Sequence, residues 1–477
     1  MDNEITISTW LFVLLTVLSL GLLIDRILLP GVRWYFRRKV NRVINEVNKR
    51  LDIEVRPFQL TKRQVQIDKL VFDEKVHQAV IDYAKEHDMP REVAQSYAYR
   101  YAREIVPSFN AYIYFRFGYW LSRGIARLLY RIRVGYFDHD SLGNISPDDT
   151  VVFVMNHRSN MDYILVSFLV AEKTALSYAV GEWARVWPLQ TLIRSMGAFF
   201  VRRNSGNPLY RTVLERYVHM ATHAGVCQAV FLEGGLSKDG ATRPPRLGFI
   251  DYMLRSYQPD NDRDIVFVPV GINYDRVVED RTLTRKLDES AEKRSLWFVI
   301  RTSAGFIFKH LLLSQRNRWR RFGYASVNFG ESVSAKQYCK KSEMVFSQLD
   351  HDERFVEVEK LVNQLMGTIE SVIPVLPVPL MCRVLLQYED KWLGELELKK
   401  LASEEIDKLR SAQAPISITA NAYEGVLNSA LDMLIARGLV EEDNGLYRAS
   451  AESMPVVRYY ANSIAVWDKA AADSDQD

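Results

Sequence analysis

Cysteine is scarce in this sequence of 477 residues. The three cysteines, Cys227, Cys339 and Cys382, lie far apart, form no CxxC pair and do not have the spacing of zinc ligands. They therefore encode neither a disulfide framework nor a structural zinc site. The pattern is typical of a protein in a reducing compartment.

An excess of charge of either sign is also lacking. Lysine and arginine number 62 against 59 aspartate and glutamate, and the net charge of +3 is too small to indicate a nucleic-acid binder. The hydrophobic content of 48%, with 23 glycines and 16 prolines, excludes extended disorder, collagen-like repeats and low complexity. A chain of this length exceeds one ordinary core, so we expect two or three packing units.

Only one long uncharged hydrophobic run is prominent, over residues 5–24 at the N-terminus. Its length is about that of a helix that crosses the hydrocarbon core of a bilayer. Asp2 and Glu4 precede the run and six basic residues follow it between Arg26 and Arg42, the reverse of a cleavable signal peptide. We therefore predict a transmembrane anchor over 1–32, with the rest of the chain in the cytoplasm. A buried core helix is the alternative.

The region 33–135 that follows is predicted to be helical. Within it, four arginines recur at spacings of seven and four beside hydrophobic residues: Arg116, Arg123, Arg127 and Arg131. This is the pattern of a basic amphipathic helix that lies on anionic lipid. A helix packed on its own domain with solvated arginines has the same periodicity and remains an alternative.

Short hydrophobic runs alternate with helical stretches between residues 136 and 337. We expect strands over 151–155, 175–180, 198–201, 226–232, 265–270 and 324–329, and helices over 186–195 and 208–223. This alternation predicts an α/β architecture with a central, largely buried sheet flanked by helices. The apolar stretch 296–313 contains three basic side chains, so we interpret it as an interfacial or core helix and not a second span.

The remaining chain is predicted to be a mostly helical region over 338–467, followed by a disordered acidic tail over 468–477. Asn444 and Gly445 separate two short hydrophobic segments, which indicates a hairpin turn.

His157 and Asp162 directly follow the predicted strand 151–155, at the carboxyl end where α/β sheets place their sites. On a regular helix these two residues would lie about 140° apart, so they can meet only where a loop runs into a helix start. A carboxylate behind one ring nitrogen orients the imidazole and leaves the other nitrogen to take a proton from a hydroxyl. A structural hydrogen bond is the alternative for the pair alone.

Three later segments are expected at the same edge of the sheet. Residues 197–204 put Arg202 and Arg203 at the end of one strand, residues 231–240 form a glycine-rich loop after another, and Val268-Pro269-Val270-Gly271 ends a third. Guanidinium groups suit a phosphate dianion, and glycines let backbone N–H groups approach an oxyanion or a phosphate.

The four segments, in this order and spacing, resemble the four blocks of the glycerolipid acyltransferases. The first block is His-x4-Asp, and the glycerol-3-phosphate acyltransferase branch is the most similar, because 197–203 matches its Gly-x-Phe-Phe-Ile-Arg-Arg block. Residues 231–240 resemble its Phe-x-Glu-Gly-Gly-Arg-Ser-Arg-x-Gly block, and Pro269 matches the fourth-block proline. The resemblance extends to residues 101–105, 327–331 and 459–463, and so covers most of the chain after Pro57.

This resemblance implies transfer of a fatty acyl group from acyl-CoA or acyl carrier protein to the sn-1 hydroxyl of glycerol 3-phosphate, without a metal or other cofactor. It implies a membrane protein, which we expect in the bacterial cytoplasmic membrane among phospholipids, with the catalytic domain on the cytoplasmic side. The implied catalytic residues are His157 as general base, Asp162, Glu233 and Gly234. The implied substrate-binding residues are Phe200, Val201, Arg202, Arg203, Gly235, Ser237, Lys238 and Pro269.

Two positions depart from the family pattern. Leu236 stands where the third block usually has arginine, and Lys238 stands where it has a second arginine. We therefore expect Arg203 to carry a large share of phosphate binding, supported by Lys238, Arg243 or Arg246. Alternatives are an acyltransferase for dihydroxyacetone phosphate or lysophosphatidic acid, and a catalytically silent membrane scaffold.

Overall fold

The computed structural model describes residues 55–137, 145–170, 174–181, 189–202, 205–285, 322–418 and 423–468, together with residues 10, 184, 185, 187 and 287. The predicted transmembrane segment, apart from Trp10, the apolar stretch 296–313 and the tail after Asp468 lie outside these residues. Among the residues described, no helix combines the length and the apolar character needed to cross a bilayer.

Eight strands of the described residues form a central sheet. Seven of them follow the spatial order β1 (Arg131–Phe137), β7 (Tyr324–Phe329), β6 (Ile265–Tyr274), β2 (Thr150–Met155), β5 (Gln228–Phe231), β3 (Ser177–Gly181) and β4 (Phe199–Val201), and β8 (Val333–Ser334) pairs with β6. The strands β6, β2, β5, β3 and β4 are mutually parallel, whereas β7 is antiparallel to β6. The carboxyl ends of the five parallel strands therefore share one edge of the sheet, as the sequence predicts.

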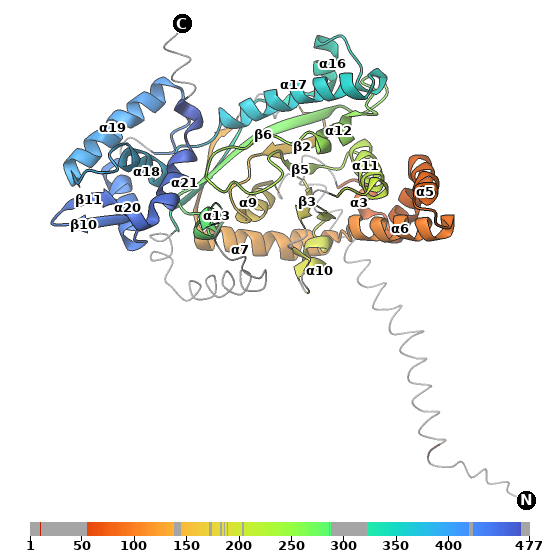
Figure 1. Ribbon diagram of the computed structural model, residues 1–477, viewed down its shortest axis with the longest axis horizontal. Helices are drawn as coiled ribbons and strands as arrows, with labels where there is room; N and C mark the ends of the chain where they lie inside the picture. Colours follow the sequence, from red (N-terminus) through yellow and green to blue (C-terminus); the bar gives the residue numbers. More distant parts are fainter. Residues whose placement is uncertain are drawn as a thin grey trace, which may run out of the picture.

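Both faces of the sheet are covered, so the protein has the predicted mixed α/β architecture (Figure 1). Alternate side chains of β2 enter two hydrophobic cores: Val151 and Phe153 face one, and Val152 and Val154 the other. The first core includes α7 (Tyr119–Leu129), α9 (Met161–Val170) and the C-terminal helices. The second includes α11 (Pro208–His223), α12 (Gly248–Leu254) and α17 (His351–Glu370). Burial on both faces explains the continuous hydrophobic runs.

Helical regions flank the sheet at opposite ends of the molecule, with α5 and α6 at one end and α18 to α21 at the other (Figure 1). The N-terminal region comprises α3 (Pro57–Leu60), α4 (Arg63–Val71), α5 (Glu74–Glu86), α6 (Arg91–Ile105) and a π-helical turn, Ile113–Gly118. The C-terminal region comprises α18 (Pro377–Gln387), α19 (Glu395–Ser411), α20 (Tyr423–Ala436), α21 (Met454–Asn462) and the strands β9 (Leu393–Gly394), β10 (Val440–Asp443) and β11 (Leu446–Ala449). Shorter helices are α10 (Leu189–Ser195), α13 (Asp280–Arg285) and α16 (Ala335–Lys341).

Several local predictions are confirmed. The strands at 151–155, 198–201 and 324–329 are found to within one residue, and the helix at 208–223 has the predicted ends. Asn444 and Gly445 join the antiparallel strands β10 and β11 with φ of 49° and 77°, the left-handed values that a type I′ hairpin turn needs. The three cysteines are free and buried.

Two predicted boundaries are wrong. The amphipathic helix was expected to reach Arg131, but it ends at Leu129, because the chain enters β1 at Arg131 and pairs there with β7. The predicted limit between 135 and 136 therefore falls inside a strand. The strand expected over 265–270 continues to Tyr274, because β7 pairs with its second half after β2 has ended.

Asn156 carries the sheet one residue beyond the end of β2. Its side-chain amide donates to the carbonyl of Ile272 at 2.9 Å and accepts from the N–H of the same residue at 2.8 Å, and the side chain is fully buried. Asn156 thus closes the gap between β2 and β6 with side-chain hydrogen bonds. The next residue, His157, leaves the sheet from a fixed point.

We predict that Asn156→Ala lowers the free energy of unfolding by about 2–4 kcal/mol, because both polar groups of Ile272 lose a buried partner. The measurement is urea unfolding. Thr150→Val is the matched control at the other end of β2, where one buried hydroxyl donates to the Thr222 carbonyl at 2.8 Å; it should cost about 1 kcal/mol. Equal losses in the two variants would contradict the double role of Asn156.

Candidate active site

The carboxylate of Asp162 is the centre of the loop that leaves β2. One oxygen accepts the ring Nδ1 of His157 at 2.8 Å, the N–H of Arg158 at 2.8 Å and the N–H of Ser159 at 3.0 Å. The other oxygen accepts the Tyr274 hydroxyl at 2.7 Å. Asp162 lies in the first turn of α9, so the pair meets where a loop enters a helix, as the sequence predicts.

The ring of His157 is held by aromatic neighbours. It stacks on Phe231 with 3.9 Å between ring centroids, and it meets Tyr163 edge to face at 5.5 Å. Because Nδ1 faces a carboxylate, this nitrogen carries the proton and Nε2 keeps its lone pair. The ring therefore has the tautomer and the fixed orientation that a general base needs.

Glu233, at the start of the glycine-rich loop, supports the backbone of His157. Its Oε1 accepts the His157 N–H at 3.0 Å and its Oε2 accepts the Arg243 N–H at 3.2 Å. Burial raises the pKa of Glu233 to about 7, opposed by the charge of Arg158 and by these two N–H groups. Both carboxylate oxygens thus already accept a backbone N–H, so Glu233 orients the loop, and the catalytic role implied for it stays a prediction.

The glycine-rich loop after β5 also contacts the His157 loop through its backbone. The N–H of Ser237 donates to the His157 carbonyl at 3.1 Å, while the Ser237 hydroxyl donates to the Ala241 carbonyl at 2.8 Å and accepts the Gly240 N–H at 3.0 Å. Ser237, predicted to bind substrate, is fully buried and organises the loop itself.

The four residues 234–236 and 238 of the glycine-rich loop differ in their exposure and contacts. Gly234 has φ of 66°, and its N–H donates to the Phe231 carbonyl at 3.0 Å, so this N–H is committed to the turn and not directed at an oxyanion. Gly235 is buried and Lys238 is exposed. Leu236 is half-buried against the hydrophobic core, which gives a physical reason for leucine at a position where an arginine would need to leave the core.

Arg202 is bound to an acidic side chain from the N-terminal region. Its Nε and Nη2 donate to the two carboxylate oxygens of Glu104 at 2.8 and 2.7 Å, and its guanidinium lies 5.1 Å from the ring centroids of both Tyr101 and Tyr210. Arg185 also pairs with Glu104. Burial would raise the pKa of Glu104, but the two arginines hold it below its usual value.

This ion pair changes the interpretation of the two predicted phosphate ligands. Arg202 donates two parallel hydrogen bonds to Glu104 and so has committed the edge that would bind a phosphate. In addition, β4 lies three strand spacings, about 14 Å, from β2. Arg203 lies outside the described residues and stays the predicted ligand. The pairing also explains the family-like segment at 101–105, whose Glu104 fixes the end of β4.

The other predicted substrate-binding residues lie within the sheet. Phe200 is fully buried in the first core, and Val201 is half-buried in contact with the second. Pro269 is buried in β6 opposite Val154, and not at a strand end as expected. The Pro269 carbonyl accepts the Gly330 N–H at 2.9 Å. Proline has no backbone N–H to donate, and Pro269 lies between the segment of β6 that pairs with β8 and the segment that pairs with β7.

Two residues near the pair were missed from the sequence. Tyr274 binds Asp162, and Glu279 accepts the Ser159 hydroxyl at 2.7 Å and the Asn160 side-chain amide at 3.1 Å. Burial raises the pKa of Glu279, opposed by these two hydrogen bonds. Polar residues directly after a strand could have indicated both. The strand that precedes them was predicted to end at 270, whereas β6 ends at Tyr274.

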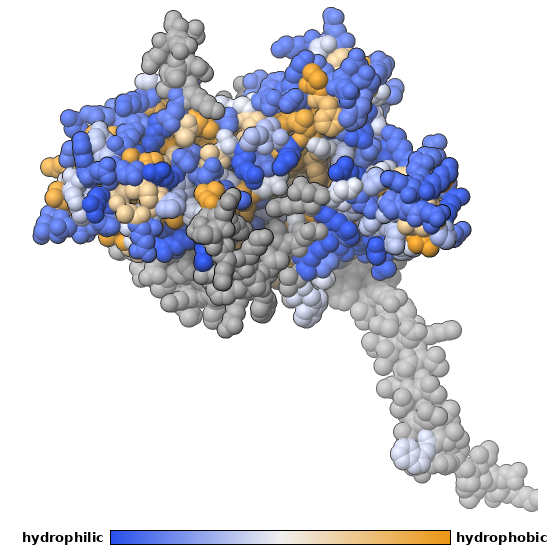
Figure 2. Space-filling model, in the orientation of Figure 1, coloured by the Kyte–Doolittle hydropathy of each residue, from blue (hydrophilic) through white to orange (hydrophobic). Residues whose placement is uncertain are grey.

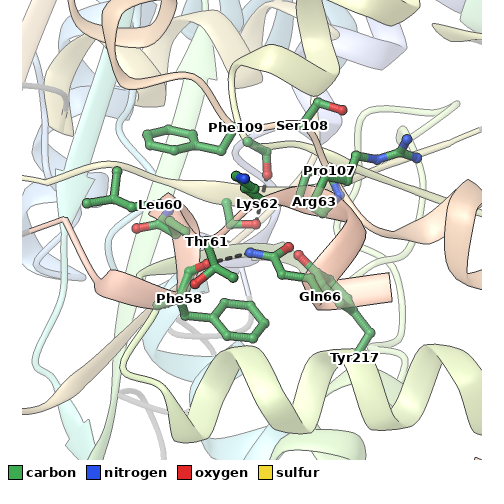
Figure 3. A pocket seen from close by; sticks show the side chains of 14 residues that line it. Phe58, Leu60, Thr61, Lys62, Arg63, Gln66, Pro107, Ser108, Phe109 and Tyr217 are labelled. Carbon is green, nitrogen blue, oxygen red and sulfur yellow. Dashed lines mark hydrogen bonds between the residues drawn. The ribbon is translucent and has the colours of Figure 1, made fainter. Parts of the chain in front are cut away.

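A pocket of about 210 Å³ lies away from this site (Figure 3). Ser177, Gly197 and Val226 line it, and these residues begin or precede β3, β4 and β5. It therefore opens at the amino-terminal edge of the sheet, opposite His157. Phe58 and Tyr217 line its wall with ring centroids 6.5 Å apart. Among the predicted site residues that the structure describes, none lines the pocket.

In the part of the chain that the structure describes, no three His, Cys, Asp or Glu side chains are grouped so as to hold a metal ion. The expectation that the site needs no metal or cofactor stays a prediction.

Two known protein families match parts of this chain. Residues 138–273 match the family described as Acyltransferase, and residues 308–467 match the family described as Glycerol-3-phosphate acyltransferase C-terminal region. The first match contains the His157 and Glu233 loops, and the second contains the C-terminal helices.

Several curated relatives are called glycerol-3-phosphate acyltransferase. The protein of Pseudomonas paraeruginosa strain PA7 is 27% identical over 441 residues, which are 90% of this chain and 51% of the relative. That of Pseudomonas putida strain KT2440 is 28% identical over 85% of this chain and 49% of its own length. The chain thus spans about half the length of the curated relatives it matches.

Among solved structures, the 1-acyl-sn-glycerophosphate (LPA) acyltransferase of Thermotoga maritima is similar with a TM-score of 0.28 and 16% identity. The match covers 64% of this chain and 98% of that one.

The raised pKa of Glu233 makes stability depend on pH. The unfolded chain loses this proton near pH 4.5 and the folded chain near 7, so the folded state binds more protons between these values. The contribution of this carboxyl is greatest below pH 4.5 and is lost as the pH rises through 7. We predict that the unfolding free energy of the wild type minus that of Glu233→Gln, both from urea unfolding, is larger at pH 5 than at pH 8. A difference that is constant with pH would contradict the assignment.

Proposed function

We propose that this chain, which belongs to the acyltransferase family, is a glycerol-3-phosphate 1-O-acyltransferase. The reaction would transfer a fatty acyl group from acyl-CoA or acyl carrier protein to the sn-1 hydroxyl of glycerol 3-phosphate, giving lysophosphatidic acid. The observation that carries the proposal is the buried pair of His157 and Asp162 at the carboxyl edge of the sheet, inside the acyltransferase match and followed by the glycerol-3-phosphate acyltransferase C-terminal region.

The chemistry proposed for His157 is general base catalysis. Its Nε2 takes the proton of the sn-1 hydroxyl while the hydroxyl oxygen bonds to the thioester carbonyl carbon. The tetrahedral intermediate then collapses, the carbon–sulfur bond breaks, and the leaving thiolate receives the proton from the imidazolium. No covalent acyl-enzyme forms, because the attacking oxygen belongs to the acceptor.

Asp162 supplies the electrostatic part of this proposal. When His157 becomes an imidazolium, the carboxylate 2.8 Å from Nδ1 stabilises its charge. Backbone N–H groups and Tyr274 hold the carboxylate still, so it does not need to reorganise during the proton transfer.

Phosphate recognition is assigned to Arg203 and Lys238. Arg202 is an ion-pair partner of Glu104, and Leu236 packs against the core, so neither of these two positions offers an uncommitted cation. Arg203 follows Arg202 directly in the sequence. Lys238 is exposed in the loop that contacts His157.

The proposal is tested by steady-state kinetics with labelled glycerol 3-phosphate and each acyl donor. His157→Ala should lower kcat about 10²- to 10⁴-fold, and Asp162→Asn should lower it strongly by misorienting the ring. His223→Ala is the matched control, because His223 also pairs with an aspartate, Asp262, at 3.2 Å, but its side chain is half-exposed on α11. A few per cent of activity remaining in His157→Ala would rule out this base. Acyl transfer to dihydroxyacetone phosphate or lysophosphatidic acid, with none to glycerol 3-phosphate, would show that the acceptor in this proposal is wrong.

A membrane location is part of the proposal. The apolar run at 5–24 would anchor the chain in the bacterial cytoplasmic membrane, with the catalytic domain on the cytoplasmic side. The helix α7 and the turn before it support a second contact with phospholipid. They expose one stripe of basic and aromatic side chains: Arg116, Phe117, Trp120, Arg123 and Arg127.

The opposite side of α7 faces the protein, with Ser122, Ala126 and Leu129 buried. The exposed fractions of Phe117 and Trp120 are 46% and 68%. On the face drawn in Figure 2, hydrophobic side chains appear in separate patches within a largely hydrophilic surface. A basic and aromatic stripe on the exposed face of a helix favours the interface of an anionic membrane.

We predict that deletion of residues 1–30 weakens attachment to membranes without abolishing it. The deleted protein should sediment with vesicles that contain phosphatidylglycerol and should not sediment with pure phosphatidylcholine, since the arginine stripe needs anionic lipid. Adding Arg123→Glu should reduce the sedimented fraction, whereas Arg458→Glu in α21 is the control. Complete solubility of the deleted protein with anionic vesicles would remove the second contact.

A further inference from the structure

We infer that helix α21 of the C-terminal region is a positioning element for the His157 loop, acting through Arg158 and the loop around Gly240. The inference rests on the proposed function and names residues that act on the same site from more than 300 positions away in the sequence.

Arg158 connects the two parts of the chain. It is the residue after His157, and its side chain is almost completely buried, with 1% exposed. Its guanidinium donates to the Gly240 carbonyl and, at 3.3 Å, to the Ser463 carbonyl just after α21. In return, the Tyr459 hydroxyl donates to the Arg158 carbonyl at 3.3 Å. Both the side chain and the backbone of Arg158 are therefore bound to the α21 segment.

Gly240 gives a second, independent sign of close docking. It has φ of 88°, and a Cβ atom at this position would lie 1.8 Å from the carbonyl oxygen of Tyr459. On the residue before it, the carbonyl of Asp239 accepts the side-chain amide of Asn462 at 3.0 Å. Any side chain at 240 would push α21 away, so the loop and the helix fit only with glycine there.

The same segment also contacts β6 and the residues that follow it. The amide of Asn273 donates to the Ser463 hydroxyl at 3.2 Å, and the Tyr460 hydroxyl accepts the Val277 N–H at 3.0 Å and binds Asp280 at 2.5 Å. Asn273 directly precedes Tyr274, and Asp280 directly follows Glu279. The α21 segment thus contacts the glycine-rich loop, the end of β6 with the residues after it, and Arg158 itself.

The charge of Arg158 makes this docking important for the ring next to it. A buried guanidinium needs acceptors, and the carbonyls of Gly240 and Ser463 accept from that of Arg158. The backbone N–H of Arg158 donates to the Asp162 carboxylate at 2.8 Å, so a shift of Arg158 moves one of the donors that fix this carboxylate. Loss of α21 contacts should therefore misorient His157 and lower kcat, while leaving the substrate KM values nearly unchanged.

The test uses full-length protein with three single variants in one helix segment. Tyr459→Phe removes the hydroxyl but keeps the ring, and Asn462→Ala removes the amide bond to Asp239. Arg458→Gln is the matched control, because the exposed Arg458 pairs with Glu389 at 3.1 Å within the C-terminal region. We expect Tyr459→Phe and Asn462→Ala each to lower kcat about 2- to 10-fold and to change the melting temperature by less than about 2 °C. Arg458→Gln should change neither.

Hydrogen exchange of the peptide that contains residues 156–162 is the second measurement, and it needs no substrate. Tyr459→Phe should speed exchange in this peptide, which includes the Arg158 and Ser159 amides bound to Asp162, and Arg458→Gln should not. Unchanged kcat and unchanged exchange in Tyr459→Phe would overturn the inference even with an active enzyme. If wild-type protein failed to acylate glycerol 3-phosphate, the proposed function would fail, while the exchange result would still decide whether α21 positions the loop.

Discussion

The buried carboxylate of Asp162 is the interaction on which the site depends. It accepts one ring N–H, two backbone N–H groups and one hydroxyl, so the residues on either side of it must wrap around a single charge. Hydrogen bonds to a charged group contribute about 1.5–3 kcal/mol each, and together they offset the cost of burying the carboxylate. The loop after β2 has its shape because these donors converge.

Two further acids, the buried Glu233 and the half-buried Glu279, hold the same loop from the ends of neighbouring strands. Glu233, after β5, binds the His157 N–H, and Glu279, after β6, binds the side chains of Ser159 and Asn160. Burial raises the pKa of both, and the charge of Asp162 raises it further. Arg158 lies among these acids and lowers the pKa of Glu233. The loop is therefore a compact arrangement of opposite charges in which geometry and protonation are coupled.

The distribution of supports explains why a long chain is built around a short motif. The parallel strands bring the His157 loop and the glycine-rich loop to one edge. The N-terminal region fixes the end of β4 through Glu104, and α21 closes on the loops from the C-terminal side. Each support lies on a different part of the sequence, so the site is complete only when the regions pack together.

Sequence patterns predicted what depends on neighbours along the chain. Hydrophobic periodicity and turn residues predicted the strand ends near 155 and 329, the helix over 208–223 and the turn at Asn444. Local propensity and burial decide these features. The meeting of His157 with Asp162 was also predictable, since it needs only a loop that enters a helix.

Partners far apart in the chain were not predictable. The sequence predicts Arg202 as a phosphate ligand because guanidinium groups suit a phosphate dianion. Its actual partner, Glu104, lies 98 residues away in the chain. Tyr459 and Arg158 are 301 residues apart. Such contacts follow from the strand order β1-β7-β6-β2-β5-β3-β4, in which neighbours are mostly not consecutive, and hydrophobic periodicity does not encode that order.

The tautomer of the neutral His157 ring is the property whose measurement tests the central claim most directly. In protein labelled with ¹⁵N-histidine, the His157 ring resonances are identified by their loss in His157→Ala. The carboxylate of Asp162 at 2.8 Å requires a proton on Nδ1, so the neutral ring should show a protonated Nδ1 and an unprotonated Nε2. A neutral ring with its proton on Nε2 would have no lone pair for the acceptor hydroxyl, and would contradict His157 as the base.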